Sequence, residues 1–303
     1  MMDFKRALDK EQTTCINGIF VVLVFLSHFG QYERMPWNKP ILAIGQVMVA
    51  PFLFFSGYGI MEQIKKKGDA YINHMPRKRI FKFYLHFCMA LCIYLLLSFL
   101  LDKDYSLSRI IWSFTALSSI GNSNWYVFAI LAMYIIVYIS FKYFKKDGII
   151  ACVIMSVLYI ILMKSFKGQD WWYNIILCFP AGMILSKYKD KICSIIRKPI
   201  FFVCVLIIAL ILYIFHLHIF AYEVVAISLC FLIVDICAYK AIKNRLFRSL
   251  GQYVFEIYIL QRVSMIIFKG YVHGWIYFSI CIVVTFGLAC VFKRLETKID
   301  MLI

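Results

Sequence analysis

The chain has 303 residues, of which 63% are hydrophobic, and a formal net charge of +17. A positive charge of this size in a soluble protein would suggest a nucleic-acid partner. A mean hydropathy of +0.81 and repeated apolar stretches of about 17 to 22 residues indicate membrane-spanning helices instead. The composition therefore predicts an all-α polytopic membrane protein with membrane lipids, and no nucleic acid, as partners.

Ten membrane spans are expected, over about 15–33, 41–61, 80–101, 122–141, 148–164, 171–186, 200–217, 219–239, 250–268 and 274–292. The stretches between them are too short for an independent soluble core, so residues 1–303 are expected to form a single membrane domain. Eight or twelve spans stay open, because residues 199–240 contain few polar breaks.

Most of the 33 Lys and Arg residues fall on one side of this arrangement. They include Lys5, Arg6 and Lys10 and the loop clusters within 65–82, 142–146, 187–198, 240–248 and 293–298. Cytoplasmic loops carry the excess of Lys and Arg in membrane proteins. Both termini are therefore expected to be cytoplasmic, in a multi-pass protein of the cell membrane whose first span is a retained signal anchor.

His28 closes the apolar run of the first span and is the main candidate for chemistry. A titratable imidazole inside a membrane helix is costly and needs a partner. Eleven residues of helix make about three turns and rise ~16 Å, so Asn17 shares a face with His28, and Lys10 does so nearly if the helix extends that far. The alternative role of His28 is a structural hydrogen bond to a neighbouring helix.

Arg77 and Arg79 stand directly before the third span, in a strongly basic loop. Guanidinium groups bind phosphate in a bidentate manner, so these two side chains are candidates for gripping a phosphate-bearing ligand. The alternative is topological, since cations at a cytoplasmic helix start are expected and also bind anionic lipids.

Polar residues at the opposite membrane face suit sugar recognition. The segment 121–126 contains Asn124 and Trp125, an amide beside a stacking face, although a helix cap within an aromatic belt is the alternative. Glu223 lies toward the same face and is a candidate for binding a polar acceptor. Asp235 and Glu256 are expected to pair with basic residues at the inner face. The eleven Cys residues show no metal-ligand or disulfide spacing, so no metal is expected.

Several stretches together resemble acyltransferase family 3, the integral-membrane O-acyltransferases of bacteria. They are 17–28 (NGIFVVLVFLSH), 51–58 (PFLFFSGY), the basic segment 77–84, Trp125-Tyr126, 179–183 (FPAGM) and 250–261 (LGQYVFEIYILQ). The resemblance covers nearly the whole chain and implies a fold of about ten transmembrane helices. It departs at two positions: Asn17 stands where the family has a cation, and Gln261 where many relatives have His.

The resemblance implies transfer of an acyl group, in the first place acetyl, from cytoplasmic acetyl-CoA to a hydroxyl of a cell-surface polysaccharide, glycolipid or precursor. It makes His28 the general base, and Arg77, Arg79, Asn17 and Lys10 the candidates for binding the acyl-CoA. Asn124, Trp125 and Glu223 are the candidates for binding the acceptor. Two other functions stay open: a transporter or flippase for a lipid-linked sugar, using His28, Asp235 and Glu256, and a non-catalytic sensor or scaffold. The oligomeric state is also open.

Overall fold

The structure is a computed structural model that describes residues 8–302, without the side chains of residues 42 and 43. This part of the chain consists of helices and connecting loops, with one isolated bridge between Lys269 and Val272 and no strand. Lys5 and Arg6, two of the cations that support the predicted topology, lie outside the described residues.

Seven long helices dominate residues 8–302: α2 (Lys10–Phe29), α4 (Ala50–Lys67), α6 (Lys82–Leu100), α8 (Trp125–Phe144), α9 (Gly148–Lys167), α13 (His218–Tyr239) and α16 (Gly274–Asp300). Shorter helices are α3 (Asn38–Ile44), α5 (Asp69–Met75), α7 (Leu107–Phe114), α10 (Cys178–Lys187), α11 (Lys189–Ile196), α12 (Pro199–Ile214), α14 (Arg245–Gly251) and α15 (Val254–Phe268). Three short 3₁₀ helices are η1 (Gly45–Val49), η3 (Lys145–Asp147) and η4 (Asp170–Trp172), and η2 (Pro76–Phe81) is a π-helical turn.

Each of the ten predicted spans contains a helix, but the helices differ in length. Within residues 8–302, six helical segments are long and apolar enough to cross a membrane, one of them being Trp125–Lys167, which contains both α8 and α9. A seventh results if α11 and α12, which meet at 85°, form one span. α10 and α15 have only 10 and 15 residues, fewer than the ~20 that a membrane usually requires. The protein is all-helical, and the count of ten spans stays a prediction.

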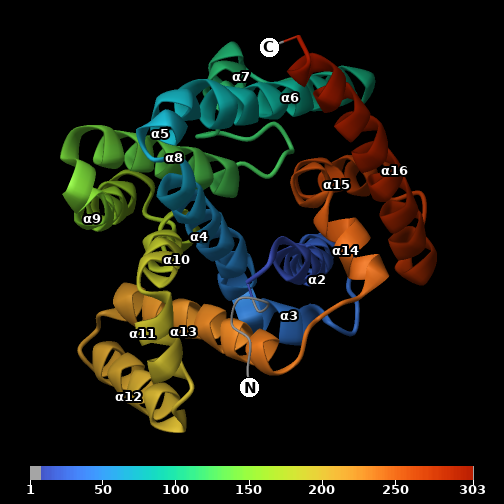
Figure 1. Cartoon of the computed structure of the whole chain (residues 1–303). Helices are drawn as coiled ribbons and strands as arrows, with labels where there is room; N and C mark the ends of the chain where they lie inside the picture. Colours follow the sequence, from blue (N-terminus) through green and yellow to red (C-terminus); the bar gives the residue numbers. More distant parts are fainter. Residues whose placement is uncertain (1–7, 303) are drawn as a thin grey trace.

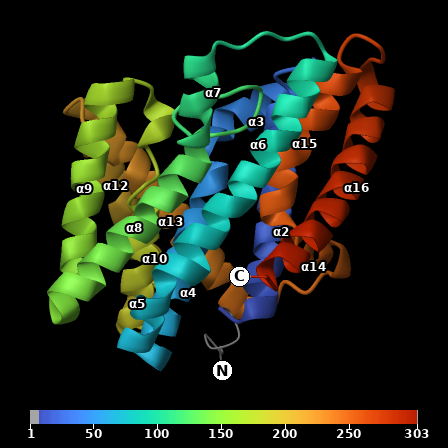
Figure 2. The same ribbon diagram turned by 90° about the horizontal axis from the view of Figure 1, so that it is seen from above.

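The helices form one bundle with α2 and α4 in its middle (Figure 1). Seen from the side, α5 and α14 lie at one end of the bundle, and α3 and α7 lie at the other (Figure 2). We call the first the basic end, because α5, α14 and their neighbouring residues carry Lys65, Lys66, Lys67, Arg77, Lys78, Arg79, Lys82, Lys243, Arg245 and Arg248. The other is the far end. α2 runs from the basic end toward the far end, so His28 lies near the far end.

The first and last helices of the described chain are tied at the basic end. At the start of α2, Glu11 accepts a hydrogen bond from Arg248 at 3.0 Å. At the end of α16, the Asp300 carboxylate lies 3.2 Å from both Lys82 Nζ and His86 Nε2. The chain therefore enters and leaves the bundle at one end, as an even number of crossings requires. That this end faces the cytoplasm stays a prediction.

Glycines let two helix pairs approach closely. A side chain on Gly57 of α4 would overlap the backbone of Phe179 in α10, and one on Gly182 would overlap that of Phe54. Gly251 of α14 lies against the backbone of α2 in the same way. Small residues at such crossings are typical of helix packing in membranes, where no hydrophobic effect drives helices together. These contacts fix α2, which carries His28, and α4, which carries part of the lining of the inner cavity described below.

Candidate active site

His28 is buried near the end of α2, with 8% of its surface exposed, and two side chains approach one nitrogen of its ring. The amide nitrogen Nε2 of Gln261 on α15 lies 2.7 Å from His28 Nδ1. The hydroxyl of Ser123, just before α8, lies 3.4 Å from the same nitrogen. The ring of Tyr258 stands beside them, 6.0 Å from the imidazole between centroids. The costly imidazole of the first span thus has its partners on two other segments.

The contact with Gln261 fixes the role of each His28 nitrogen. An amide nitrogen only donates hydrogen bonds, and Gln261 Nε2 also donates to the carbonyl oxygen of Tyr258 at 3.0 Å. Its bond to His28 therefore makes Nδ1 the acceptor, so a neutral imidazole carries its proton on Nε2. The Ser123 hydroxyl can accept as well as donate, and in the other tautomer its oxygen is placed to accept a hydrogen bond from Nδ1–H.

A cavity of about 360 Å³ lies between the basic end and this cluster. Its lining consists of Thr13, Asn17, Phe52, Phe55, Ser56, Arg79, Phe83, Tyr126, Ile130, Tyr134, Val254, Phe255 and Tyr258. We call it the inner cavity. It combines one cation with several hydroxyls and aromatic faces, a lining suited to an elongated ligand that is part polar and part apolar.

The inner cavity brings together two of the predicted donor-binding residues, Asn17 and Arg79. Arg79 belongs to the π-turn η2, and its guanidinium carbon lies 5.2 Å from the ring centroid of Tyr134, a cation–π distance. Asn17 Oδ1 is buried and has no hydrogen-bond partner among residues 8–302. The cavity therefore holds a positive charge beside the position where the sequence has Asn17 in place of a cation.

The other two predicted donor-binding residues do not line the inner cavity. Arg77 and Lys10 are both exposed at the basic end. A further cavity of about 430 Å³ opens there, lined by Glu11, Lys243, Asn244, Arg245, Arg248, Ser249 and Gln252. Lys10 is the chain neighbour of one lining residue of that cavity, Glu11.

An aromatic wall closes the inner cavity toward His28. Tyr126 and Tyr258 line the cavity, and their ring centroids are 5.3 Å apart. The Tyr258 ring also lies 6.0 Å from the His28 ring between centroids. The cavity that begins at Arg79 therefore ends one ring away from the buried imidazole.

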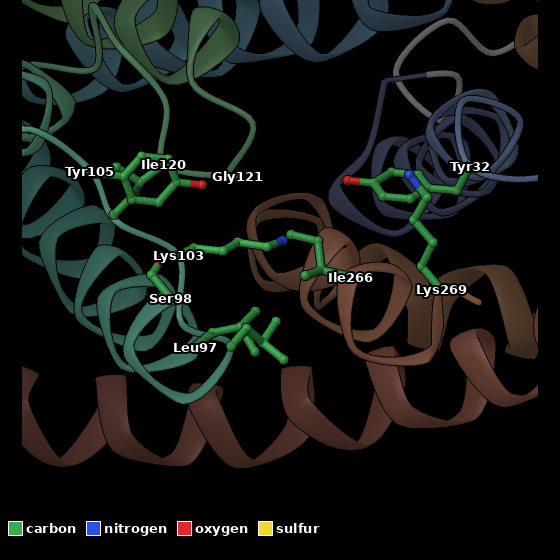
Figure 3. A pocket seen from close by; sticks show the side chains of 10 residues that line it. Tyr32, Leu97, Ser98, Lys103, Tyr105, Ile120, Gly121, Ile266 and Lys269 are labelled. Atoms are coloured by element: carbon green, nitrogen blue, oxygen red, sulfur yellow. The ribbon is translucent and has the colours of Figure 1, made fainter. Parts of the chain in front are cut away.

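A smaller cavity of about 190 Å³ lies beyond His28 at the far end, and we call it the outer cavity (Figure 3). It is lined by Tyr32, Leu97, Ser98, Leu101, Lys103, Tyr105, Ile120, Gly121, Ile266 and Lys269. Helix α15 passes all three places in order: Tyr258 lines the inner cavity, Gln261 binds His28, and Ile266 lines the outer cavity. Ile266 is eight residues after Tyr258 on this helix, a rise of only ~12 Å.

The predicted acceptor-binding residues lie outside both cavities. Asn124 donates a hydrogen bond from Nδ2 to the carbonyl oxygen of Ala116 at 3.0 Å, and the ring of Trp125 packs edge-on against Tyr126. Glu223 is buried, and its carboxylate accepts hydrogen bonds from the backbone N–H of Leu177, just before α10. These contacts give the three residues structural roles in the arrangement described, and their acceptor-binding role stays a prediction.

The remaining carboxylates of the spans lie elsewhere. Glu256 forms an ion pair with Lys293 of α16 at 2.5 Å, which confirms the expected pairing with a basic residue. Asp235 Oδ1 has no hydrogen-bond partner in the described structure. Among residues 8–302, no three His, Cys, Asp or Glu side chains gather in a way that could hold a metal ion.

The acyltransferase family 3 model, described as an acyltransferase domain, matches residues 14–294. The chain belongs to this family. Together with the apolar helices, the match makes it a multi-pass membrane acyltransferase. No curated protein and no solved structure matches the acyltransferase significantly.

Sequence reasoning missed the partners of His28 in this acyltransferase. Gln261 stood out as a departure from the family pattern, but nothing in the sequence linked it to His28, which is 233 residues away. Ser123 belonged to a segment assigned to sugar recognition. Gln261 and His28 are both buried polar side chains within apolar runs. This shared feature is the sequence signal that could have predicted their contact.

Proposed function

We propose that this membrane acyltransferase moves an acyl group, in the first place acetyl, from cytoplasmic acyl-CoA to a hydroxyl of a cell-surface polysaccharide, glycolipid or precursor. One observation carries the proposal: the inner cavity contains Asn17 and Arg79 and ends at Tyr258, directly against His28. A donor that enters at the basic end can thus bring its acyl group close to a base near the far end.

The proposal that acyl-CoA binds in the inner cavity rests on the charge and the apolar lining of that cavity. Acyl-CoA carries phosphates, which guanidinium groups bind strongly, and Arg79 is the cation that lines the inner cavity. Arg77 and Lys10 at the basic end are proposed to hold those phosphates of acyl-CoA that stay outside the inner cavity. The apolar rings of Phe52, Phe55 and Phe83 suit the uncharged arm that joins the phosphates to the thioester.

His28 is proposed as the general base of the transfer. A sugar hydroxyl has a pKa far above 7 and needs a base within hydrogen-bond reach as it attacks. His28 takes the hydroxyl proton while the oxygen bonds to the thioester carbonyl carbon. The tetrahedral intermediate then expels the sulfur, and the CoA thiolate receives the proton from His28. Reaction at Nε2 requires the ring proton to reside on Nδ1, where the N–H can donate a hydrogen bond to the Ser123 hydroxyl oxygen.

The acceptor is proposed to approach from the far end, where Asn124 and Trp125 lie nearby and the outer cavity opens. A lipid-linked sugar or surface glycan would reach His28 from there without crossing the bundle. This places donor and acceptor on opposite sides of the imidazole, with α15 beside both.

Replacement of His28 tests the proposal. Purified protein in lipid nanodiscs is given acetyl-CoA and a mixture of glycan acceptors, and release of CoA is measured together with the acetylated products. His28→Ala should lower the rate at least a hundredfold, the usual effect of losing a general base. Binding of acetyl-CoA should stay unchanged, since His28 lies beyond the inner cavity.

An exposed histidine provides the matched control. His74 on α5 is exposed, and His74→Ala should keep full activity. Turnover of His28→Ala at the rate of the original protein would remove His28 from the catalytic role.

A further inference from the structure

We propose that the outer cavity binds an acidic group, a phosphate or a carboxylate, of the acyl acceptor, so that the acyltransferase selects negatively charged sugars. This inference rests on the proposed function, because it names the substrate class of the same site. It starts from the residues of the outer cavity, of which only Gly121 belongs to a segment that the sequence had marked for function.

Hydrogen-bond donors from three separate segments converge on this cavity. Tyr32 follows α2, Lys103 and Tyr105 belong to the loop between α6 and α7, and Lys269 follows α15. Figure 3 shows the hydroxyls of Tyr32 and Tyr105 pointing toward each other across the cavity, with the Lys103 side chain extended into the space beside them. Lys269 lies alongside the Tyr32 ring, with its Nζ 5.8 Å from the ring centroid.

The outer cavity is lined by two lysines and, among residues 8–302, by no carboxylate. Neither Lys103 nor Lys269 forms an ion pair with a carboxylate of residues 8–302. A third cation is close by, since Arg262 of α15 interacts with the Tyr32 hydroxyl and bonds Gln31 at 3.1 Å. Burial raises the pKa of Tyr32, so its hydroxyl stays protonated and can donate to an anion.

Membrane topology does not explain these cations. The positive-inside rule accounts for an excess of Lys and Arg at one end of a bundle only, and the basic end already has that excess. Cations that line a cavity at the far end therefore need another cause, and binding of an anion is the direct one. Lysine ammonium groups and tyrosine hydroxyls are the donors that such a group requires.

The position of the cavity identifies the anion as part of the acceptor. Gly121 lines it two residues before Ser123, which contacts His28 Nδ1, and Arg262 adjoins Gln261, which binds the same nitrogen. An acidic group held between Lys103 and Lys269 would therefore place a neighbouring sugar hydroxyl close to the imidazole. The donor needs no such site at the far end, because its phosphates bind at the basic end.

Binding of three sugars tests the inference. Glucose, glucose 1-phosphate and glucuronate are titrated calorimetrically into the protein in phosphatidylcholine nanodiscs, and acetyl transfer to each is followed with labelled acetyl-CoA. At least one charged sugar should bind about tenfold or more tightly than glucose, and Lys103→Glu and Lys269→Glu should each remove most of that preference. Lys103→Gln and Lys269→Gln should show smaller losses in the same direction.

Lys39 provides the matched control. It is an exposed cation on α3 at the far end and does not line the outer cavity, so Lys39→Glu should leave the preference unchanged. Unchanged binding of acetyl-CoA by the Lys103 and Lys269 variants shows that they are folded. Loss of sugar binding in nanodiscs that contain phosphatidylglycerol would identify a lipid headgroup as the occupant and overturn the assignment.

The outcome separates this inference from the proposed function. Equal binding of glucose and both charged sugars, or a preference that survives Lys103→Glu and Lys269→Glu, overturns the inference even where acetyl transfer depends on His28. Conversely, charged sugars that bind through Lys103 and Lys269 without ever being acetylated confirm the anion site and contradict the proposed transfer.

Discussion

Two side chains meet the same nitrogen of His28, and they favour opposite tautomers of its ring. Gln261 donates to Nδ1 and so keeps the proton on Nε2, whereas the Ser123 hydroxyl oxygen can accept a hydrogen bond from Nδ1–H and so favours the tautomer in which Nε2 is unprotonated. In the proposed transfer, this balance would set how much of the enzyme is ready to receive a hydroxyl proton. Gln261 and Ser123 are thus positioning residues for His28.

Removal of the Ser123 hydroxyl should slow the acyl transfer. We expect Ser123→Ala to lower kcat about tenfold with little change in KM for acetyl-CoA, because an oriented general base contributes in the transition state. Adding Gln261→Glu should restore much of the loss, since a carboxylate accepts the proton on Nδ1. The measurement is steady-state CoA release across pH. A change in KM alone, or no rescue by Gln261→Glu, would rule out the tautomer role.

At the scale of residues, the sequence predicted the imidazole but not what surrounds it. The cost of a histidine in a membrane helix singled out His28, and the helical repeat placed Asn17 on its face. The inner cavity has Asn17 and Arg79 in its lining, and their role in binding the donor stays a prediction. Ser123 and Gln261 are 95 and 233 residues from His28, so their contacts depend on how distant helices pack, which local periodicity does not encode.

At the scale of elements, close helix crossings hold the site in place. Gly57 of α4 faces the backbone of α10, whereas Gly59, half a turn further along the same helix, faces open space. We expect Gly57→Ala to lower stability by about 1–3 kcal/mol through overpacking, because backbone rather than a flexible side chain blocks the new methyl group. Gly59→Ala should be neutral or slightly stabilising. Thermal unfolding of the two variants in detergent is monitored by size-exclusion chromatography. Equal unfolding midpoints would contradict the close approach of α4 and α10 at Gly57.

Apolar runs predicted where the helices are, and local signals explain where their ends differ. α2 begins at Lys10, before the expected start near residue 15, because the Asp9 side chain caps it by accepting from the Gln12 N–H at 2.7 Å. Lys10 thereby belongs to the first helix, as its predicted role requires. The π-turn around Pro76, which carries Arg79, left no periodic signal in the sequence.

At the scale of the whole molecule, the asymmetry of charge predicts the orientation in the membrane. The basic end is expected to face the cytoplasm and the far end the outside. Lys66 and Tyr271 are exposed at opposite ends of the bundle. The orientation is measured with a single cysteine at one of these two positions, in a variant whose eleven native Cys residues are replaced. A membrane-impermeant maleimide added to intact cells should label Tyr271→Cys only, and both sites after permeabilisation. Labelling of Lys66→Cys in intact cells would reverse the orientation.

The aromatic wall between the two cavities also has an electrical consequence. Water in the cavities would conduct from either surface, so most of the transmembrane voltage would fall across the thin layer of Tyr126, Tyr258 and His28 rather than across the full bilayer. A proton that reaches or leaves His28 would therefore move through a concentrated field. In the proposed transfer, the same layer would keep the bundle from leaking ions, so that acyl groups would pass outward without discharge of the membrane potential.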